Sequence, residues 1–267
     1  MESKFYEKKL GILGGGQLGK MLITECNKMD ISVSVLDPSN SSPCKNICEK
    51  FECGDFKDYD TVVKFGEKCD IITFEIEHVN VDALEFLEKN GKEVYPKSKT
   101  LKIIQDKNKQ KSFFKKNSIP TANFKFFSKL SEFKSSINQN KINFPCIWKK
   151  TKFGYDGFGV KILNSVDDIG SLPETEMIIE DLIPFDKELS VIVSRNISGE
   201  IKCYDTVEME FNKNSNQVEF VISPARIKNK VNKYAKELAI KISESLDCIG
   251  LLAVEMFLYG DKILVNE

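Results

Sequence analysis

The sequence has few of the residues that build most metal and redox centres. His78 is the only histidine among the 267 residues, and none of the eight cysteines forms a C-x-x-C pair. Familiar zinc sites need such pairs or several histidines at set spacings, so this kind of site is excluded. No signal-peptide pattern is visible at the N-terminus, so we expect reduced thiols and a cytoplasmic protein.

Long apolar runs and an excess of one charge are also lacking. No apolar run approaches the roughly 20 residues that a membrane-spanning helix needs. The formal net charge is −1, with acidic and basic residues mixed along the chain, so the charge gives no argument for a nucleic acid or a membrane as partner. At roughly 100–200 residues per domain, the length allows two domains.

The first hundred residues alternate between apolar strands and amphipathic helices. Such alternation predicts a parallel sheet with helices on both faces, and hence an α/β domain of the Rossmann-like kind over residues 1–98. The segment PSNSSPCKN after the second strand is turn-rich and predicts a loop. Strands are expected at 8–13, 31–37, 70–77 and 92–96, and helices at 17–29, 56–68 and 81–91.

The pattern changes after Ser98. Residues 98–118 read as one or two basic helices, and most of the later segments are strands with few helices between them. Such an order favours an antiparallel sheet and a second domain of α+β character over residues 99–267. Strands are expected at 144–151, 157–163, 175–183, 187–196, 200–205, 217–225, 251–260 and 261–267, with a helix at 233–246.

The segment LGILGGGQLGK, residues 10–20, carries a G-x-G-x-x-G turn between a strand and a helix. Gly14, Gly16 and Gly19 make the pattern, and Asp37 ends the next strand. This is the dinucleotide-binding fingerprint, which would suit an NAD-dependent oxidoreductase. The same turn could instead serve another purpose.

A second glycine-rich segment, KKTKFGYDGFGV, lies between two strands rather than between a strand and a helix. Gly154, Gly157 and Gly159 would let backbone N–H groups approach phosphate oxygens, and Lys149 would add a cation. The glycines could equally serve only the geometry of a long hairpin. The residues alone leave both interpretations open.

Several carboxylates stand on or beside apolar strands. Glu180 precedes a turn at Pro184, where backbone groups could meet an adenine edge and Glu188 could accept hydrogen bonds from ribose; an exposed acidic turn is the alternative. Glu255 and Glu267 lie in two further strands. Buried side by side they would suit Mg²⁺ with substrate phosphates, whereas on half-exposed strands they would simply face water.

Taken together, these segments resemble the ATP-grasp ligases. The order GILGGGQLGKM, TFEIEHV, SIPTANF, KFGYDGFG, ISPAR and VEMF…LVNE is similar to the N5-carboxyaminoimidazole ribonucleotide synthase family. The resemblance runs from Lys9 to Glu267. It implies a pre-ATP-grasp domain followed by an ATP-grasp domain, with linker helices and a lid at about 99–182 and a central part at 183–267.

The resemblance also implies ligands and roles. ATP and Mg²⁺ would bind the second domain, with Glu255 and Glu267 holding the metal, while Lys149, Tyr155 and Asp156 would act in catalysis. The implied nucleotide-binding residues are Lys107, Lys149, Gly154, Tyr155, Asp156, Gly157, Phe158, Gly159, Val160, Glu180, Asp181, Leu182, Ile183, Glu188, Glu208, Asn266 and Glu267. The implied substrate-binding residues are Gly16, Gln17, Leu18, Glu75, Tyr155, Asp156 and Arg226.

The sequence departs from the family pattern at several positions. Phe158 stands where the family has arginine, Lys107 replaces an arginine that contacts ATP, and Glu208 or Met209 replaces a histidine. Lysine keeps the charge but loses bidentate geometry. The segment ILVNE ends in mid-strand, so we expect the family's chain to continue beyond Glu267 into a segment with a ligand-binding arginine and histidine and a small C-terminal domain.

The implied reaction is the ATP-dependent carboxylation of 5-aminoimidazole ribonucleotide with bicarbonate, by a homodimer. The glycine turn would then hold the ribonucleotide phosphate, and Asp37 would have no ribose to bind. Three alternatives remain at this point: another ATP-grasp carboxylate–amine ligase, an NAD-dependent oxidoreductase, and a non-catalytic nucleotide-binding module.

Overall fold

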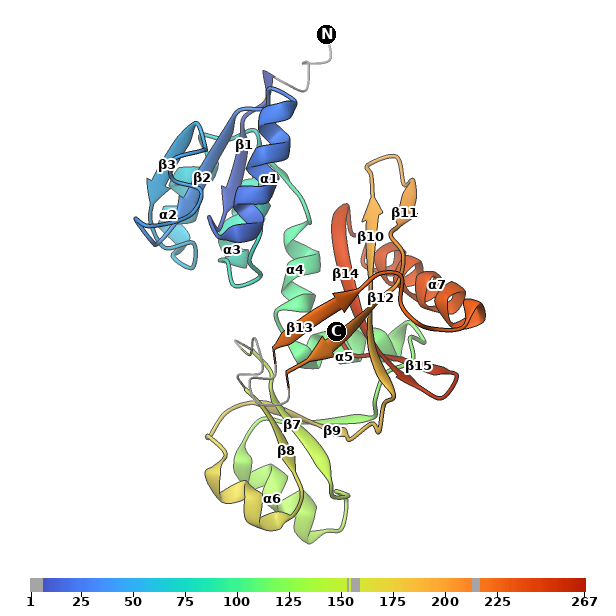
Figure 1. Ribbon diagram of the computed structural model, residues 1–267. Coiled ribbons are helices and arrows are strands. Elements are labelled where there is room, and N and C mark those ends of the chain that lie inside the picture. Colours follow the sequence, from blue (N-terminus) through green and yellow to red (C-terminus); the bar gives the residue numbers. More distant parts are fainter. Residues whose placement is uncertain (1–6, 153, 155–158, 213–216) are drawn as a thin grey trace. The chain divides into compact units, whose positions relative to one another are not determined.

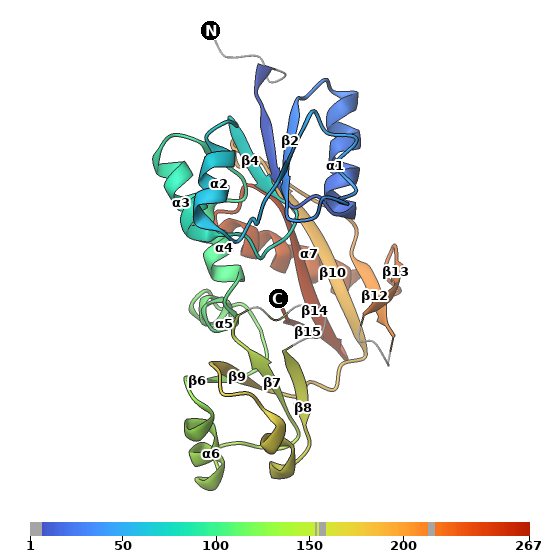
Figure 2. The same ribbon diagram turned by 90° about the vertical axis from the view of Figure 1, so that its left-hand side faces the viewer.

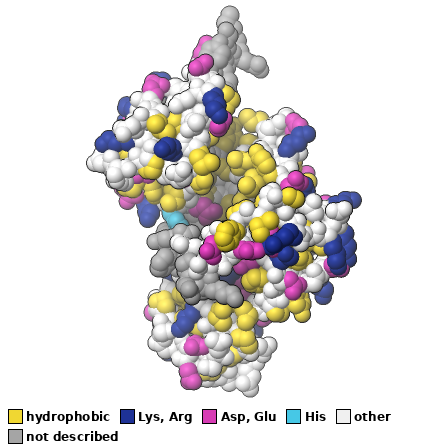
Figure 3. All heavy atoms as spheres, in the orientation of Figure 1, with side chains coloured by type: hydrophobic (Ala, Val, Ile, Leu, Met, Phe, Trp, Pro, Cys, Tyr) yellow, Lys and Arg dark blue, Asp and Glu magenta, His cyan; other side chains and the backbone are white. Residues whose placement is uncertain are grey.

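The computed structural model describes residues 7–152, 154, 159–212 and 217–267. The chain forms two compact units, Met1–Lys102 and Ile103–Glu267 (Figure 1). Helix α4 (Ser98–Ile104) runs across the division between them. On the face shown in Figure 3, acidic and basic side chains are interspersed within each unit.

The first unit is built around a five-stranded parallel sheet with the order β3-β2-β1-β4-β5. The central strand, β1, ends where the glycine turn begins. The strands are β1 (Leu10–Leu13), β2 (Val33–Asp37), β3 (Lys50–Cys53), β4 (Ile71–Phe74) and β5 (Glu93–Val94), and the helices are α1 (Gln17–Lys28), α2 (Tyr59–Gly66) and α3 (Val81–Lys89).

Both faces of this sheet are covered. Alternate residues of a strand point to opposite faces, so Ile12 packs with Ile23 of α1, whereas Leu13 belongs to the cluster that includes Phe65 of α2 and Leu84 of α3. Figure 2 shows α1 on one side of the sheet and α2 and α3 on the other. The expected doubly covered parallel sheet is confirmed.

The second unit begins with α5 (Lys107–Lys116) and a four-stranded antiparallel sheet of order β6-β9-β7-β8. The carboxylate of Asp106 caps α5 by accepting from the amides of Asn108 and Lys109. A local core around Phe133 and Trp148 fills one face of the sheet. Its elements are β6 (Phe124–Phe127), α6 (Leu130–Asn138), β7 (Cys146–Lys150), β8 (Val160–Leu163), the 3-10 helix η2 (Val166–Ser171) and β9 (Met177–Asp181).

A six-stranded antiparallel sheet completes the second unit, in the order β13-β12-β10-β14-β15 with β11 paired to β10. Helix α7 (Asn229–Ser245) packs along one face, where Leu189, Val191 and Met256 meet Leu238 and Ile242. The strands are β10 (Lys187–Arg195), β11 (Ile201–Cys203), β12 (Val207–Phe211), β13 (Val218–Ile222), β14 (Gly250–Tyr259) and β15 (Lys262–Val265). The expected α+β character is confirmed.

The two faces of the six-stranded sheet carry different residues. Residues directly opposite one another in antiparallel strands share a face, and the register pairs Glu188 with Phe257 and Ser190 with Glu255. Leu189 and Val254 point the other way, into the core with α7. Glu188 and Glu255 therefore lie on the face that α7 does not cover.

Some elements differ from the sequence-based expectation. Strand β3 falls within a stretch that had no predicted element, and β6, α6 and β12 were not predicted either. All eight cysteines have free thiols. Among the described residues, no helix combines the length and the apolar character needed to cross a membrane.

Candidate functional site

In the first unit, the glycine turn is held by two carboxylates. The amide of Gly15 donates to Asp37 Oδ2 at 2.7 Å, and the amide of Gly16 donates to Glu75 Oε1, also at 2.7 Å. Gly14 adopts φ 97°, a region that favours glycine. A Cβ atom on Gly16 would lie 2.7 Å from Glu75 Oε1, so glycine is required for this contact.

These contacts change the interpretation of the dinucleotide fingerprint. A pyrophosphate would need the turn's backbone N–H groups, and two of them already bind carboxylates of β2 and of the segment after β4. Asp37 also accepts from the amide of Ser39, which further occupies the group that would bind ribose. The first amides of α1, including Gln17 and Leu18, have no acceptor within the helix, and Gly16 supplies no side-chain cap.

In the second unit, Lys149 occupies a central position. It ends the apolar part of β7 and is 8% exposed. Its Nζ lies 3.0 Å from Glu180 Oε2 and donates to Asn266 Oδ1 at 2.9 Å. The register places Glu180 opposite Ile147, so Lys149 and Glu180 point to the same face of the four-stranded sheet.

Glu180 is buried and contacts a second lysine. Lys111 of α5 lies with its Nζ 3.2 Å from Glu180 Oε1, and the two side chains are 2% and 3% exposed. Lys111 Nζ also donates to Thr121 Oγ1 at 2.7 Å. Sequence reasoning missed Lys111 because the segment DKNKQK looks like a solvated basic helix.

The segment after β15 brings three more predicted residues together. The amide of Glu255 donates to the carbonyl of Glu267 at 2.7 Å, and the amide of Asn266 donates to the carbonyl of Glu255 at 2.8 Å. The side chain of Lys107 pairs with the carboxylate of Glu267. Lys107, Lys149, Glu180, Glu255, Asn266 and Glu267 thus form one connected group, which we call the lysine–glutamate cluster together with Lys111.

The charges in this cluster shift each other's pKa values. Burial lowers the pKa of Lys111 to about 8, although Glu180 partly opposes the shift. Burial alone would raise the pKa of Glu180, but Lys111 and Lys149 outweigh it and the pKa is lowered. The pKa of Glu267 is lowered in the same way, with Lys107 opposing the effect of burial.

Glu188 is a half-buried carboxyl on the face of the sheet that carries Glu255. Burial raises its pKa to about 7, and Lys149 acts in the opposite direction. It is therefore divided between its acid and carboxylate forms near neutral pH. As a carboxylate it can accept hydrogen bonds from hydroxyl groups, which suits the ribose role implied by the sequence.

Glu208 and Arg226 lie elsewhere. Glu208 is opposite Leu189, so its side chain is on the face that α7 covers, whereas Glu188 is on the other face. Its carboxylate accepts from Lys187 at 2.6 Å and from Arg226 Nη2 at 2.7 Å. These partners, with Arg226 the strongest, lower the pKa of Glu208 to about 2.

The remaining predicted residues belong to the hairpin of β7 and β8, to the end of β9 and to the turn after it. Gly159 adopts φ 83°, and an added Cβ atom would lie 3.3 Å from Gly154 Cα. Asp181 is exposed and accepts from Asn123 at 2.8 Å. Val160 is exposed, while Leu182 and Ile183 are half-buried. Tyr155, Asp156, Gly157 and Phe158 lie outside the described residues.

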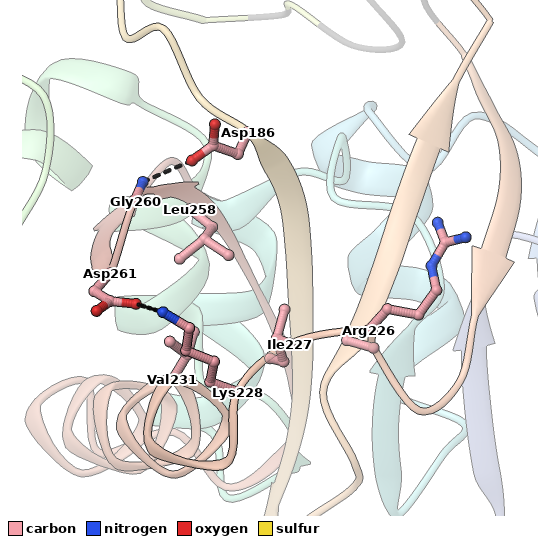
Figure 4. Close-up of a pocket in the computed structure, with 9 residues that line it drawn as sticks. Asp186, Arg226, Ile227, Lys228, Val231, Leu258, Gly260 and Asp261 are labelled. Atoms are coloured by element: carbon pink, nitrogen blue, oxygen red, sulfur yellow. Dashed lines mark hydrogen bonds and ion pairs between the residues drawn. The ribbon is translucent and has the colours of Figure 1, made fainter.

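A separate pocket of about 480 Å³ lies beside the N-terminal end of α7 (Figure 4). Asp261 pairs with Lys228 at 3.0 Å, and Asp186 accepts from the amide of Gly260 at 2.6 Å. The guanidinium of Arg226 points away from these groups. Leu258, which lines the pocket, belongs to the core with α7, so the pocket opens on the face opposite to Glu188.

A divalent cation could be held in the cluster only by two carboxylates together with ligands from outside the protein. Within the described ranges, no three or more His, Cys, Asp or Glu side chains converge as a metal site. Glu255 and Glu267 are adjacent through their backbone hydrogen bonds. Mg²⁺ often takes one or two carboxylates and completes its shell with water and substrate phosphates, so this pair suits a metal that arrives with a nucleotide.

Comparisons with known proteins agree with this architecture. Residues 7–105 match the ribonucleotide synthetase preATP-grasp domain, and residues 112–267 match the ATP-grasp domain. The N5-carboxyaminoimidazole ribonucleotide synthase of Bacillus subtilis is 34% identical over 97% of this chain and 68% of its own length. The chloroplastic phosphoribosylaminoimidazole carboxylase of Vigna aconitifolia is 35% identical over 98% of this chain and 47% of its own.

Solved structures show the same fold. The carboxyaminoimidazole ribonucleotide synthase of Aspergillus clavatus in complex with ATP has a TM-score of 0.91 and 33% identity, covering 98% of this chain and 70% of that one. The Thermotoga maritima synthetase has a TM-score of 0.86 and 38% identity, covering 97% and 68%. The resemblance first drawn from the sequence is confirmed.

This chain spans about two thirds of the bacterial relatives and about half of the plant one. Its matches nevertheless run through both units, from the glycine turn to the end of β15. The chain belongs to the N5-carboxyaminoimidazole ribonucleotide synthase family of ATP-grasp proteins.

Proposed function

We propose that this chain is an ATP-dependent ligase that carboxylates 5-aminoimidazole ribonucleotide. ATP, bicarbonate and the ribonucleotide would give ADP, phosphate and N5-carboxyaminoimidazole ribonucleotide, a step of purine biosynthesis. The observation that carries the proposal is the arrangement of Lys149, which stands between Glu180 and Asn266 beside two adjacent carboxylates. A relative from Aspergillus clavatus binds ADP and 5-aminoimidazole ribonucleotide.

The chemistry asks mainly for alignment and charge neutralisation. A bicarbonate oxygen attacks the γ-phosphoryl group and ADP leaves, which forms carboxyphosphate. The exocyclic amine of the ribonucleotide then bonds to the carboxyl carbon, directly or after release of carbon dioxide; phosphate leaves and the amine loses a proton. In phosphoryl transfer the protein contributes mostly positioning and electrostatic stabilisation.

Each part of the second unit has a role in this scheme. Lys149 supplies positive charge for the phosphates, and Glu188 in its carboxylate form accepts from the ribose hydroxyls. Glu255 and Glu267 would hold Mg²⁺, which neutralises phosphate charge when bound. The hairpin that contains Gly154 and Gly159 would cover the triphosphate with backbone N–H groups and exclude water from the reactive intermediate.

In the first unit, the amides of Gln17 and Leu18 at the start of α1 suit the ribonucleotide phosphate, because a helix N-terminus favours an anion. Glu75, fixed by the amide of Gly16, would position the substrate. The same carboxylates, Asp37 and Glu75, weaken the case for an NAD-dependent oxidoreductase, since they occupy amides that a pyrophosphate would need.

We also propose that the protein forms a homodimer and acts in the cytoplasm. Analytical sedimentation of the purified protein tests the homodimer.

Isotope transfer tests the reaction itself. With ¹⁸O-labelled bicarbonate, the oxygen that attacks the γ-phosphoryl group remains on phosphorus, so we expect one label in each phosphate released when 5-aminoimidazole ribonucleotide is present. Mass spectrometry of the phosphate gives the answer. Unlabelled phosphate would refute activation of bicarbonate. Labelled phosphate with a different amine as the required acceptor would indicate another ATP-grasp ligase.

A further inference from the structure

Lys111 is a buried lysine to which the proposed mechanism gives no role. It lies in α5, where Lys115 and Lys116 are exposed, yet its own side chain is 2% exposed. Placing an ammonium group out of water costs several kcal/mol unless partners compensate. A methionine or leucine could fill the same space without that cost, so the charge itself needs an explanation.

The partners of Lys111 connect it to both sheets of the second unit. Its Nζ pairs with Glu180 of β9 and donates to the hydroxyl of Thr121. That hydroxyl in turn donates to the carbonyl of Val265 at 2.7 Å, at the end of β15. Lys111 is therefore linked through Thr121 to Val265, the residue before Asn266. It also contacts Glu180, the carboxylate that pairs with Lys149.

A single carboxylate, that of Glu180, contacts two buried ammonium groups. Lys111 and Lys149 share one carboxylate, with Lys111 at Oε1 of Glu180 and Lys149 at Oε2. The other partners of the two lysines, Thr121 and Asn266, are neutral. The neighbouring carboxylate of Glu267 pairs with Lys107. Glu180 is therefore shared between two ammonium groups and is not the counter-ion of Lys149 alone.

We propose that Lys111 is a positioning residue for the nucleotide: by pairing with Glu180 it prevents that carboxylate from neutralising Lys149, and so leaves the Lys149 ammonium available to a phosphate group. This inference rests on the proposed function, in which Lys149 binds ATP. Without Lys111, Glu180 would pair with Lys149 alone, at a distance of 3.0 Å between Nζ and Oε2. A phosphate would then have to compete with Glu180 in a buried setting, where such pairs are strong.

The test compares affinities for ADP with Mg²⁺ and for adenosine, because their ratio isolates the contribution of the phosphates. We expect Lys111→Met to reduce the preference for ADP about tenfold, the loss of roughly one charge-assisted contact. Adding Glu180→Gln to this variant removes the competing carboxylate, so the double variant should recover the preference to within about threefold of the unchanged protein. Lys115→Met, an exposed change in the same helix, is the matched control.

The outcomes distinguish a failure of the Lys111 inference from a failure of the proposed ATP-binding function. If Lys111 were only a packing residue, the double variant would be no better than Lys111→Met, and that result overturns the inference. An unchanged ADP preference in Lys111→Met overturns it as well, while ADP binding by the unchanged protein would leave the proposed function standing. If the unchanged protein binds no ADP, the proposed function fails and the inference fails with it.

Glu180→Gln alone decides the matter should Lys111→Met not fold. Removing this carboxylate takes away the anionic competitor that lies 3.0 Å from Lys149, so the preference for ADP over adenosine should rise or stay equal. A clear fall in that preference would mean that Glu180 helps Lys149 to bind phosphate, contrary to the inference. The fluorescence of Trp148, the only tryptophan and a buried neighbour of Lys149, reports whether each variant is folded.

Discussion

The Nζ atom of Lys149 lies 2.9 Å from the amide oxygen of Asn266, 117 residues further along the chain. This hydrogen bond joins the four-stranded sheet to the end of β15 in the six-stranded sheet. It places a cation next to Glu255 and Glu267 through the backbone of Asn266. A cation and two carboxylates at one point can receive the phosphates and the metal of a nucleotide together.

Replacing Lys149 by methionine should abolish most ATP turnover while the protein stays folded. One charge-assisted contact to phosphate is worth about 1.5–3 kcal/mol, so ADP affinity should fall roughly tenfold to hundredfold. Titration calorimetry with ADP and Mg²⁺ measures this. Lys150→Met is the matched control, because Lys150 is the next residue of β7 and points to the other face of the sheet. Equal effects of the two substitutions would count against the assigned role.

Replacing Gly16 by alanine should affect the ribonucleotide rather than ATP. The new Cβ atom would lie 2.7 Å from Glu75 Oε1, so the carboxylate must move away from the turn. We expect the KM for 5-aminoimidazole ribonucleotide to rise about tenfold, equivalent to roughly 1.4 kcal/mol, with little change in ADP affinity. Gly170→Ala has open space around its new methyl group and should change neither quantity. A normal KM in Gly16→Ala would remove Glu75 from the substrate site.

Replacing Glu188 by glutamine should stabilise the protein at alkaline pH. Burial raises the folded-state pKa of Glu188 to about 7, so the folded protein binds this proton more tightly than the unfolded chain does. The free energy of unfolding therefore declines as pH rises from about 4.5 to 7 on account of this group. Denaturant titrations should show the variant more stable by on the order of 2 kcal/mol at pH 8, and no more stable near pH 4. A variant that is less stable at pH 8 would contradict this account of Glu188.

Replacing Glu208 by glutamine should destabilise the protein at neutral pH. Arg226 and Lys187 lower the folded-state pKa of Glu208 to about 2, so its contribution to stability is present above about pH 4.5 and is lost as pH falls towards 2. Because Arg226 is 57% exposed, solvent screening reduces the effect, and we expect a loss of about 1 kcal/mol at pH 7.

The pH dependence provides the check on Glu208. The difference between the variant and the unchanged protein should shrink steadily below pH 4.5, as seen in denaturant titrations at several pH values. Glu237→Gln, an exposed change on α7 with 57% of the side chain accessible, should stay within about 0.5 kcal/mol at every pH. A constant difference for Glu208→Gln down to pH 2 would show that its charge is not the cause.

The overall architecture could be predicted because it depends on local patterns. Alternating strands and helices in the first hundred residues indicated the doubly covered parallel sheet, and the glycines between β1 and α1 indicated a turn that joins a strand to a helix. Strand β3 was missed because KFEC lies at the sheet edge and is partly exposed, so it lacks the apolar pattern of the inner strands.

The electrostatic part of the site was harder to predict, because it depends on contacts between distant segments. Lys111 looks like any other lysine of a basic helix, and only the packing of α5 against Glu180 buries it. In the same way, nothing in GILGGG shows that Gly15 and Gly16 donate to Asp37 and Glu75. Most carboxylates and lysines of the site could be named from the sequence, whereas the tertiary fold determines which of them form ion pairs with one another.

We propose that this chain couples ATP hydrolysis to the carboxylation of 5-aminoimidazole ribonucleotide. The most direct measurement is phosphate release from ATP with Mg²⁺ and bicarbonate, with and without the ribonucleotide, using the full-length protein. We predict strong stimulation by the ribonucleotide, which Lys149→Met removes. Phosphate release that is the same with and without the ribonucleotide, or none in either case, would refute this function.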